Sequence, residues 1–210
     1  MKTRVLALTA LLIVAAGLAA VAQGQKPASP PGTAATQVIG KYVKTAYEES
    51  YHDGKWIEVT YSRPILRDRK NIFGTGADYG KTVNGGAPVW RAGANQTTRL
   101  KTEVPLIFSG KTLPAGEYSV FVALQEKAWT LIFSSWPAQE KYDPNFKAAL
   151  WGAYGYTPDK DVLRVEMTLS TLPFSVDQFT ISFIDMTAEG GKLAMMWDKT
   201  MASVPFKAGM

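Results

Sequence analysis

The chain of 210 residues contains no cysteine and only one histidine. The lack of cysteine excludes disulfides, thiolate zinc sites and thiol nucleophiles, so stability must come from burial of a large core. A single histidine makes a transition-metal site of the usual ligand types unexpected, and no cofactor is predicted. His52 stands beside Asp53 and can act as an oriented base, but an exposed loop histidine is the simpler interpretation.

A strong charge of one sign is also missing. The formal net charge is +5, and two of the positive charges, Lys2 and Arg4, lie close to the N-terminus. No basic stripe with interleaved aromatic residues is present, so nucleic acid is not an expected partner.

The N-terminal segment has the three parts of an export signal. Lys2 and Arg4 precede a long uncharged apolar run, which ends in a small-x-small site at Ala22. This pattern predicts a signal peptide over residues 1–22 that is removed to leave Gln23 first. The run is also long enough for an uncleaved membrane anchor. Its many alanines favour cleavage, so we expect a periplasmic or secreted protein that meets the membrane only through its signal peptide.

Two further divisions follow from composition. Residues 23–36 are rich in Pro, Ala, Gly, Ser and Thr without apolar periodicity, which predicts a flexible lead-in. Residues 37–210 form one predicted domain, because no internal repeat is visible and the length suits a single core.

Short runs of alternating polar and apolar residues, typical of β-strands, recur along this domain. They lie at residues 57–61, 98–104, 118–124, 129–133, 163–169, 179–183, 193–197 and 203–206. Segment 41–52 alone has weak helical character. Strands in series without intervening helices predict a mostly β fold, an antiparallel β-sandwich of jelly-roll or immunoglobulin-like type. Two long aromatic connections, 64–90 and 135–160, are expected to be functional or to pack as lids.

Polar residues near these connections are the candidate ligand-binding groups. Arg63 follows a strand and Arg91 follows an aromatic residue, so together they can form a fork for a carboxylate or a sugar acid. Asn95 and nearby aromatic rings complete the candidate site, with Trp90, Tyr79, Trp151 and Tyr154. In the structural alternative, Arg91 pairs with a buried carboxylate and Asn95 occupies a left-handed turn position.

Oxygen ligands in the second connection offer a calcium site as another hypothesis. The residues are Asp143, Asn145, Asp159 and Asp161. Their spacing matches no EF-hand loop, and turns explain them more simply. No metal site is therefore predicted.

Several segments together carry a resemblance to a known family. They include Tyr61-Ser62-Arg63-Pro64, Val89-Trp90-Arg91-Ala92-Gly93-Ala94-Asn95, Leu113-Pro114-Ala115-Gly116-Glu117-Tyr118-Ser119 and Trp151-Gly152-Ala153-Tyr154. Their order and wording resemble the bacterial DUF2911 family of exported proteins of unknown function, over residues 27–206. The resemblance implies an exported β-rich domain and carries over no catalytic residue. Gln96 stands where the family usually has an acidic residue, and Asn84-Gly85-Gly86 lengthens the first connection.

Two functions compete at this point. The first is a non-catalytic binding or structural module of the bacterial cell envelope, with a small anionic or sugar ligand. The second is a carboxylate-dependent hydrolase or lyase acting on an envelope sugar or peptide, using Glu58 or Glu103. Glycoside hydrolysis of the usual type needs two carboxylates about 5–10 Å apart in a concave site. Both glutamates lie on the polar phase of their strands, which favours the binding module.

Overall fold

The computed structural model describes residues 28–209. The predicted signal peptide, residues 1–22, lies outside them. The main sheet has nine strands, and in spatial order they are β1 (Pro31–Val38), β4 (Lys55–Ser62), β5 (Thr98–Thr102), β8 (Gly116–Gln125), β9 (Ala128–Ser134), β10 (Asp161–Thr187), β11 (Gly190–Ala208), β6 (Leu106–Phe108) and β7 (Lys111–Leu113). A separate hairpin joins β2 (Lys41–Lys44) to β3 (Glu49–His52).

Helical structure is slight within residues 28–209. It consists of α2 (Lys81–Asn84) and two 3-10 turns, η1 (Gly76–Asp78) and η2 (Pro158–Lys160). None of these helices is long and apolar enough to cross a membrane.

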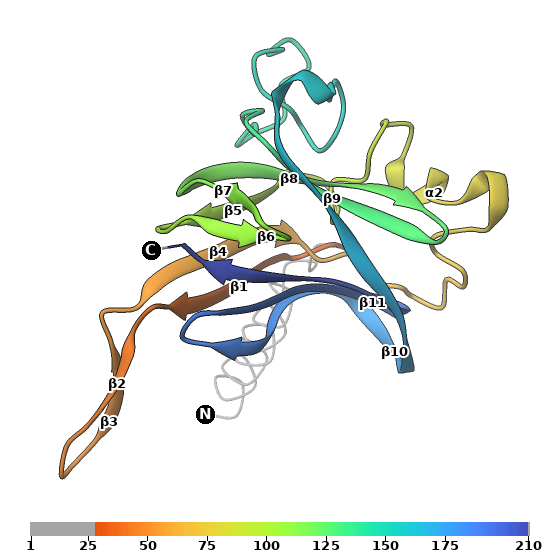
Figure 1. The fold of residues 1–210 in the computed structure, drawn as a ribbon. Coiled ribbons are helices and arrows are strands. Elements are labelled where there is room, and N and C mark those ends of the chain that lie inside the picture. The colour runs from red at the N-terminus through yellow and green to blue at the C-terminus, as the bar shows by residue number, and fades with distance from the viewer. Residues whose placement is uncertain (1–27, 210) are drawn as a thin grey trace, which may run out of the picture.

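The sheet folds over into two layers, as predicted for an antiparallel β-sandwich. β10 first pairs with β9 and then continues along β11, so one long strand passes from one layer to the other (Figure 1). The chain after β4 also reaches the second layer, where the Leu66 amide donates to Asp177 O at 2.6 Å and the Phe179 amide donates to Pro64 O at 2.9 Å. These pairings close the sandwich beside the first long connection.

Four strands predicted at the end of the chain are two continuous strands. Segments 163–169 and 179–183 both belong to β10, and segments 193–197 and 203–206 belong to β11. The polarity pattern breaks where the strands bulge, because the β10–β11 register shifts between Thr171 and Val176. Pro173 lies in this gap, where its missing amide hydrogen costs no ladder bond.

Part of the predicted flexible lead-in is ordered, which corrects that prediction. Residues 31–36 lie in β1, which pairs with β4 from Pro31↔Ser62 to Val38↔Lys55. An edge strand gains backbone hydrogen bonds without needing many apolar side chains, and in β1 only Ala34 and Val38 are buried. Composition alone therefore failed to predict that residues 31–36 form part of a β-strand.

The weak helical pattern of residues 41–52 also gave a wrong prediction. These residues form the β2–β3 hairpin, which projects away from the sandwich in Figure 1. Tyr42 and Tyr51 face each other across the strands with ring centroids 5.0 Å apart, a cross-strand pair that stabilises a hairpin. The Thr45 hydroxyl accepts hydrogen bonds from the amides of Tyr47 and Glu48 and so fixes the turn.

The core fills the space between the layers and extends to the outer face of β8 and β9. Val120 and Val122 join the main core, whereas Phe121 belongs to a second cluster with Ile132 and Leu150 beneath the 135–160 connection. β8 is therefore covered on both faces, as its sequence predicted.

Candidate functional site

The first long connection returns to the sheet at Trp90. The amide of Trp90 donates to Val122 O at 2.9 Å, and the Val122 amide donates to Trp90 O at 2.8 Å. Trp90 thus occupies the place beside β8 that lies beyond the end of β5. This pairing fixes the backbone next to Arg91.

A tight turn follows Trp90 and presents the next residues. Ala92 and Asn95 have φ of 50° and 56°, in the left-handed region that few side chains adopt. Gly93 has φ of 153°, and a Cβ there would lie 2.7 Å from Ser62 O. Left-handed residues held in place by tertiary structure concentrate at functional sites.

Thr97 joins this turn to the second long connection. Its hydroxyl lies 3.0 Å from Leu150 O and 2.8 Å from Gly152 O. Thr97 is buried, so these two hydrogen bonds hold the turn against the second connection away from solvent. Gly152 is thereby placed against Arg91.

Arg91 is held between the two connections. Its Nη1 donates to Asn95 O at 3.0 Å, and its Cζ lies 4.9 Å from the centroid of the Tyr154 ring. The Tyr154 hydroxyl in turn donates to Gly85 O at 3.1 Å. Arg91 is only 9% exposed, yet none of the ion pairs within residues 28–209 involves it. The guanidinium is therefore positioned by a ring and a carbonyl, with its charge left uncompensated by a carboxylate.

Arg69 is a second fixed guanidinium in the same region. Its Nε donates to Leu66 O at 2.9 Å and its Nη2 donates to Ile65 O at 2.7 Å. Its Cζ lies 5.5 Å from the centroid of the Trp197 ring. Like Arg91, Arg69 takes part in none of the ion pairs of the described residues.

Both arginines line a cleft of about 230 Å³. Its other walls come from the first connection, the turn after Trp90 and β11, with Pro64, Ile72, Thr82, Val83, Gly85, Trp90, Gly93, Ala94, Asn95 and Trp197. The Trp90 and Trp197 rings lie parallel, 6.3 Å apart, and both are almost fully buried. They give the cleft a rigid floor and offer little surface for stacking.

The cleft is electropositive. Of the described residues that line it, two are arginines and none is acidic. In a partly desolvated cleft a guanidinium without a carboxylate partner favours an anionic ligand. The structural alternative for Arg91, pairing with a buried carboxylate, is wrong for residues 28–209, whereas the left-handed position of Asn95 is confirmed.

Three of the predicted ligand-binding residues thus meet at this cleft, namely Arg91, Asn95 and Trp90, and the ring of Tyr154 packs against Arg91. The structure places Arg63 elsewhere, at the end of β4, with Nη2 3.4 Å from Thr180 Oγ1.

Tyr79 and Trp151 also lie outside the cleft. The Tyr79 hydroxyl accepts a hydrogen bond from Trp129 Nε1 at 2.9 Å, and burial raises the pKa of Tyr79. Trp151 packs against Tyr142, with centroids 5.7 Å apart.

Sequence reasoning missed Arg69 and Trp197. Arg69 belongs to the first aromatic connection, residues 64–90. The residues around it do not predict that its side chain donates to the carbonyl groups of Leu66 and Ile65. Trp197 comes from β11, more than a hundred residues away in sequence. No local signal could have found Arg69, because Asp68 beside it offers an ordinary ion-pair partner in the sequence.

The acidic residues of the second connection do not converge on a metal. Asp143 accepts from the Asn145 amide at 2.8 Å, which is the predicted turn. Asp161 pairs with Arg164 at 2.6 Å and accepts from the Tyr156 hydroxyl. No group of three His, Cys, Asp or Glu side chains within the described residues is placed to hold a metal ion.

These observations define a class of protein: an antiparallel β-sandwich with a basic cleft built from its first long connection. A family model described as a protein of unknown function, DUF2911, matches residues 43–206, so the chain belongs to the DUF2911 family. No curated protein and no solved structure matches the chain.

Proposed function

We propose that this protein is a non-catalytic binding module of the bacterial cell envelope, and that the Arg69–Arg91 cleft binds a small ligand through a carboxylate, as in a sugar acid. The observation that most supports this proposal is the buried Arg91 guanidinium. Tyr154 and Asn95 O fix its position, and it has no carboxylate partner among the described residues. Its location in the envelope rests on the signal-peptide pattern of residues 1–22.

The size and charge of the cleft support this ligand class. A volume of about 230 Å³ is below the roughly 300–1,000 Å³ of pockets for drug-sized ligands, which favours a ligand near the size of one sugar. Two guanidinium groups suit a carboxylate, because their planar donors match its two oxygens. Thr82 and Asn95 add neutral polar groups that can meet hydroxyls.

The hydrolase alternative finds less support. Glu58 is exposed and lies opposite Lys101 on β5, while Glu103 accepts from the Trp56 amide at 2.8 Å. Neither glutamate lines the cleft. An acid–base pair of carboxylates is the requirement for ordinary glycoside hydrolysis, and the described lining does not supply it.

The test is calorimetric titration of the protein with D-galacturonate and with neutral D-galactose. We expect galacturonate to bind and galactose to bind far more weakly, because only the acid offers a carboxylate to the arginines. Arg91→Gln should weaken galacturonate binding by about tenfold to a hundredfold, the range for losing hydrogen bonds to a charged group.

Arg67→Gln is the matched control, because Arg67 is an exposed arginine of the same connection that does not line the cleft. It removes the same charge and should leave the affinity nearly unchanged. Equal losses in the two variants would show a general charge effect and contradict the proposed cleft.

A further inference from the structure

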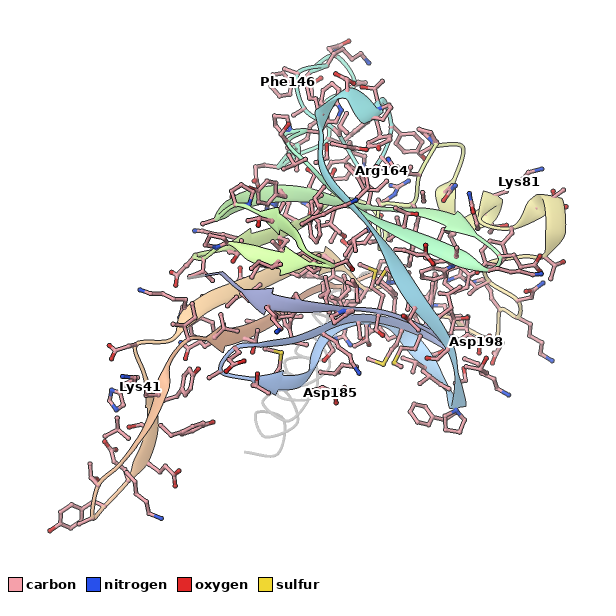
Figure 2. All side chains as sticks on the ribbon, viewed as in Figure 1. Lys41, Lys81, Phe146, Arg164, Asp185 and Asp198 are labelled. Carbon is pink, nitrogen blue, oxygen red and sulfur yellow. The ribbon has the colours of Figure 1, made fainter. Side chains whose placement is uncertain are left out.

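A second hollow adjoins the cleft and is lined by exposed aromatic residues. It measures about 310 Å³ and is formed by the second long connection, with Gln139, Tyr142, Asp143, Pro144, Phe146, Lys147, Ala149, Leu150, Trp151, Tyr154 and Gly155. Tyr142, Phe146 and Tyr154 are 57%, 52% and 49% exposed. Figure 2 shows Phe146 on the outer part of this connection, away from the sheet layers.

The exposed rings stand on a fixed backbone. The buried Gln139 side chain places Nε2 within 2.7 Å of Phe146 O and 3.0 Å of Ala149 O, and its Oε1 accepts from the Asp143 amide at 2.9 Å. The side chain thus braces the connection across seven to ten residues. A surface held in shape before binding loses little entropy when a ligand arrives, which favours a recognition role.

Tyr154 links this hollow to the cleft. It lines the hollow, its ring packs on Arg91, and its hydroxyl donates to Gly85 O at the cleft wall. Only 4.9 Å separates the Arg91 Cζ from the centroid of that ring. A ligand held by Arg91 therefore has aromatic surface within the reach of its next unit.

We propose that the two hollows form one extended site for an acidic oligosaccharide, with one acid group at Arg91 and following sugar rings on Tyr154, Tyr142 and Trp151. This inference rests on the proposed function of the cleft. Pyranose rings present C–H faces that pack on aromatic rings while their hydroxyls stay in water, so they suit half-exposed tyrosines. Lys147 also lines the second hollow and offers a cation to a second acid group.

The second hollow is not acidic, because its one cation, Lys147, balances its one carboxylate. Its one acidic residue, Asp143, already accepts from the Asn145 amide at 2.8 Å. The hollow thus combines a cation with aromatic faces, the combination expected for repeating units that are both ring-shaped and acidic.

The experiment is titration of the wild-type protein with D-galacturonate, with the α-1,4-linked trimer of galacturonate, and with a neutral trisaccharide. A trimer that uses only the cleft gains a statistical factor of at most about three over the monomer, whereas contact with both hollows should raise affinity by about tenfold or more. The neutral trisaccharide should bind far more weakly than the acidic trimer.

Tyr142→Ala should reduce the gain from chain length, because Tyr142 lines the second hollow and not the cleft. Tyr47→Ala is its control, because Tyr47 is 98% exposed at the tip of the β2–β3 hairpin. A thermal unfolding curve checks that each variant is folded.

The outcomes separate the two proposals. Monomer binding that depends on Arg91 but shows no gain for the trimer would overturn the extended site and leave the cleft. Absence of any binding that depends on Arg91 would overturn both. Tighter binding of an acidic peptide, tri-glutamate, with the same dependence on Tyr142, would overturn the assignment to a glycan.

Discussion

Arg91 lies directly against the backbone of Gly152, in the space that a side chain would otherwise fill. A Cβ at Gly152 would lie 2.5 Å from Arg91 Nη1 and 2.7 Å from Arg91 Cζ, and Gly152 has a φ of 63°. The glycine therefore meets two requirements at once, the left-handed backbone and the close approach of a guanidinium. This relationship ties the second connection to the charge of the cleft.

Gly152→Ala should displace the guanidinium and weaken galacturonate binding nearly as much as Arg91→Gln does. Gly76→Ala is the control, because Gly76 also has a positive φ of 53° and its added Cβ would meet nothing within 4 Å. Both variants should lose about 1 kcal/mol of stability from backbone strain. Equal ligand affinity in the two variants, measured by calorimetry, would contradict the role assigned to Gly152.

Tyr61→Phe should destabilise the sandwich without affecting the cleft charge. The Tyr61 hydroxyl accepts from the Ile181 amide at 2.9 Å and lies 3.3 Å from Ile181 O, and the whole group is buried. Its removal leaves buried backbone groups of β10 without that partner, a cost of about 1–3 kcal/mol. Urea denaturation measures this loss. Tyr42→Phe, at an exposed site of β2, should show no change, and a similar result for both variants would count against the buried bridge.

Tyr156 should make stability depend on pH in the alkaline range. Burial, followed by hydrogen bonding to Asp161, raises the pKa of Tyr156 from 10.0 to about 12. Since the folded state holds the phenol proton more tightly, this stabilisation is complete below pH 10 and is lost as pH rises through 12. Tyr156→Phe should be less stable than wild type at pH 9, and the difference should shrink by pH 11. A constant difference in urea denaturation at the two pH values would contradict this linkage.

The first residue of the exported protein tests the predicted signal peptide. Mass spectrometry of protein recovered from the periplasm or the medium should give a chain that begins at Gln23. Replacement of Ala20 and Ala22 by leucine should block this cleavage, because the peptidase needs small residues there. Intact protein with Met1 in those fractions would argue for the anchor instead.

Much of the fold followed from local patterns. Period-two alternation placed the strands around Leu100, Val120 and Leu131, because each strand has a buried face that leaves a trace in the sequence. The β10 strand was divided because its bulges interrupt that trace near Pro173. The β2–β3 hairpin was missed because neither of its faces joins the main core, so its side chains carry little burial pattern.

The candidate site was predictable only in part. Arg91, Trp90 and Asn95 lie on one turn, so local reading could group them. Arg69 joins them only through a chain reversal at Leu66 and Ile65, and Trp197 only through the packing of the second layer. Such contacts depend on tertiary structure, which no spacing along the chain expresses.

The most direct test of the central claim is a crystal structure of the protein with D-galacturonate bound. We expect the carboxylate within hydrogen-bonding distance of the Arg91 guanidinium, inside the cleft that Arg69 also lines. A well-defined ligand that places its carboxylate away from both arginines, or that binds outside this cleft, would contradict the account.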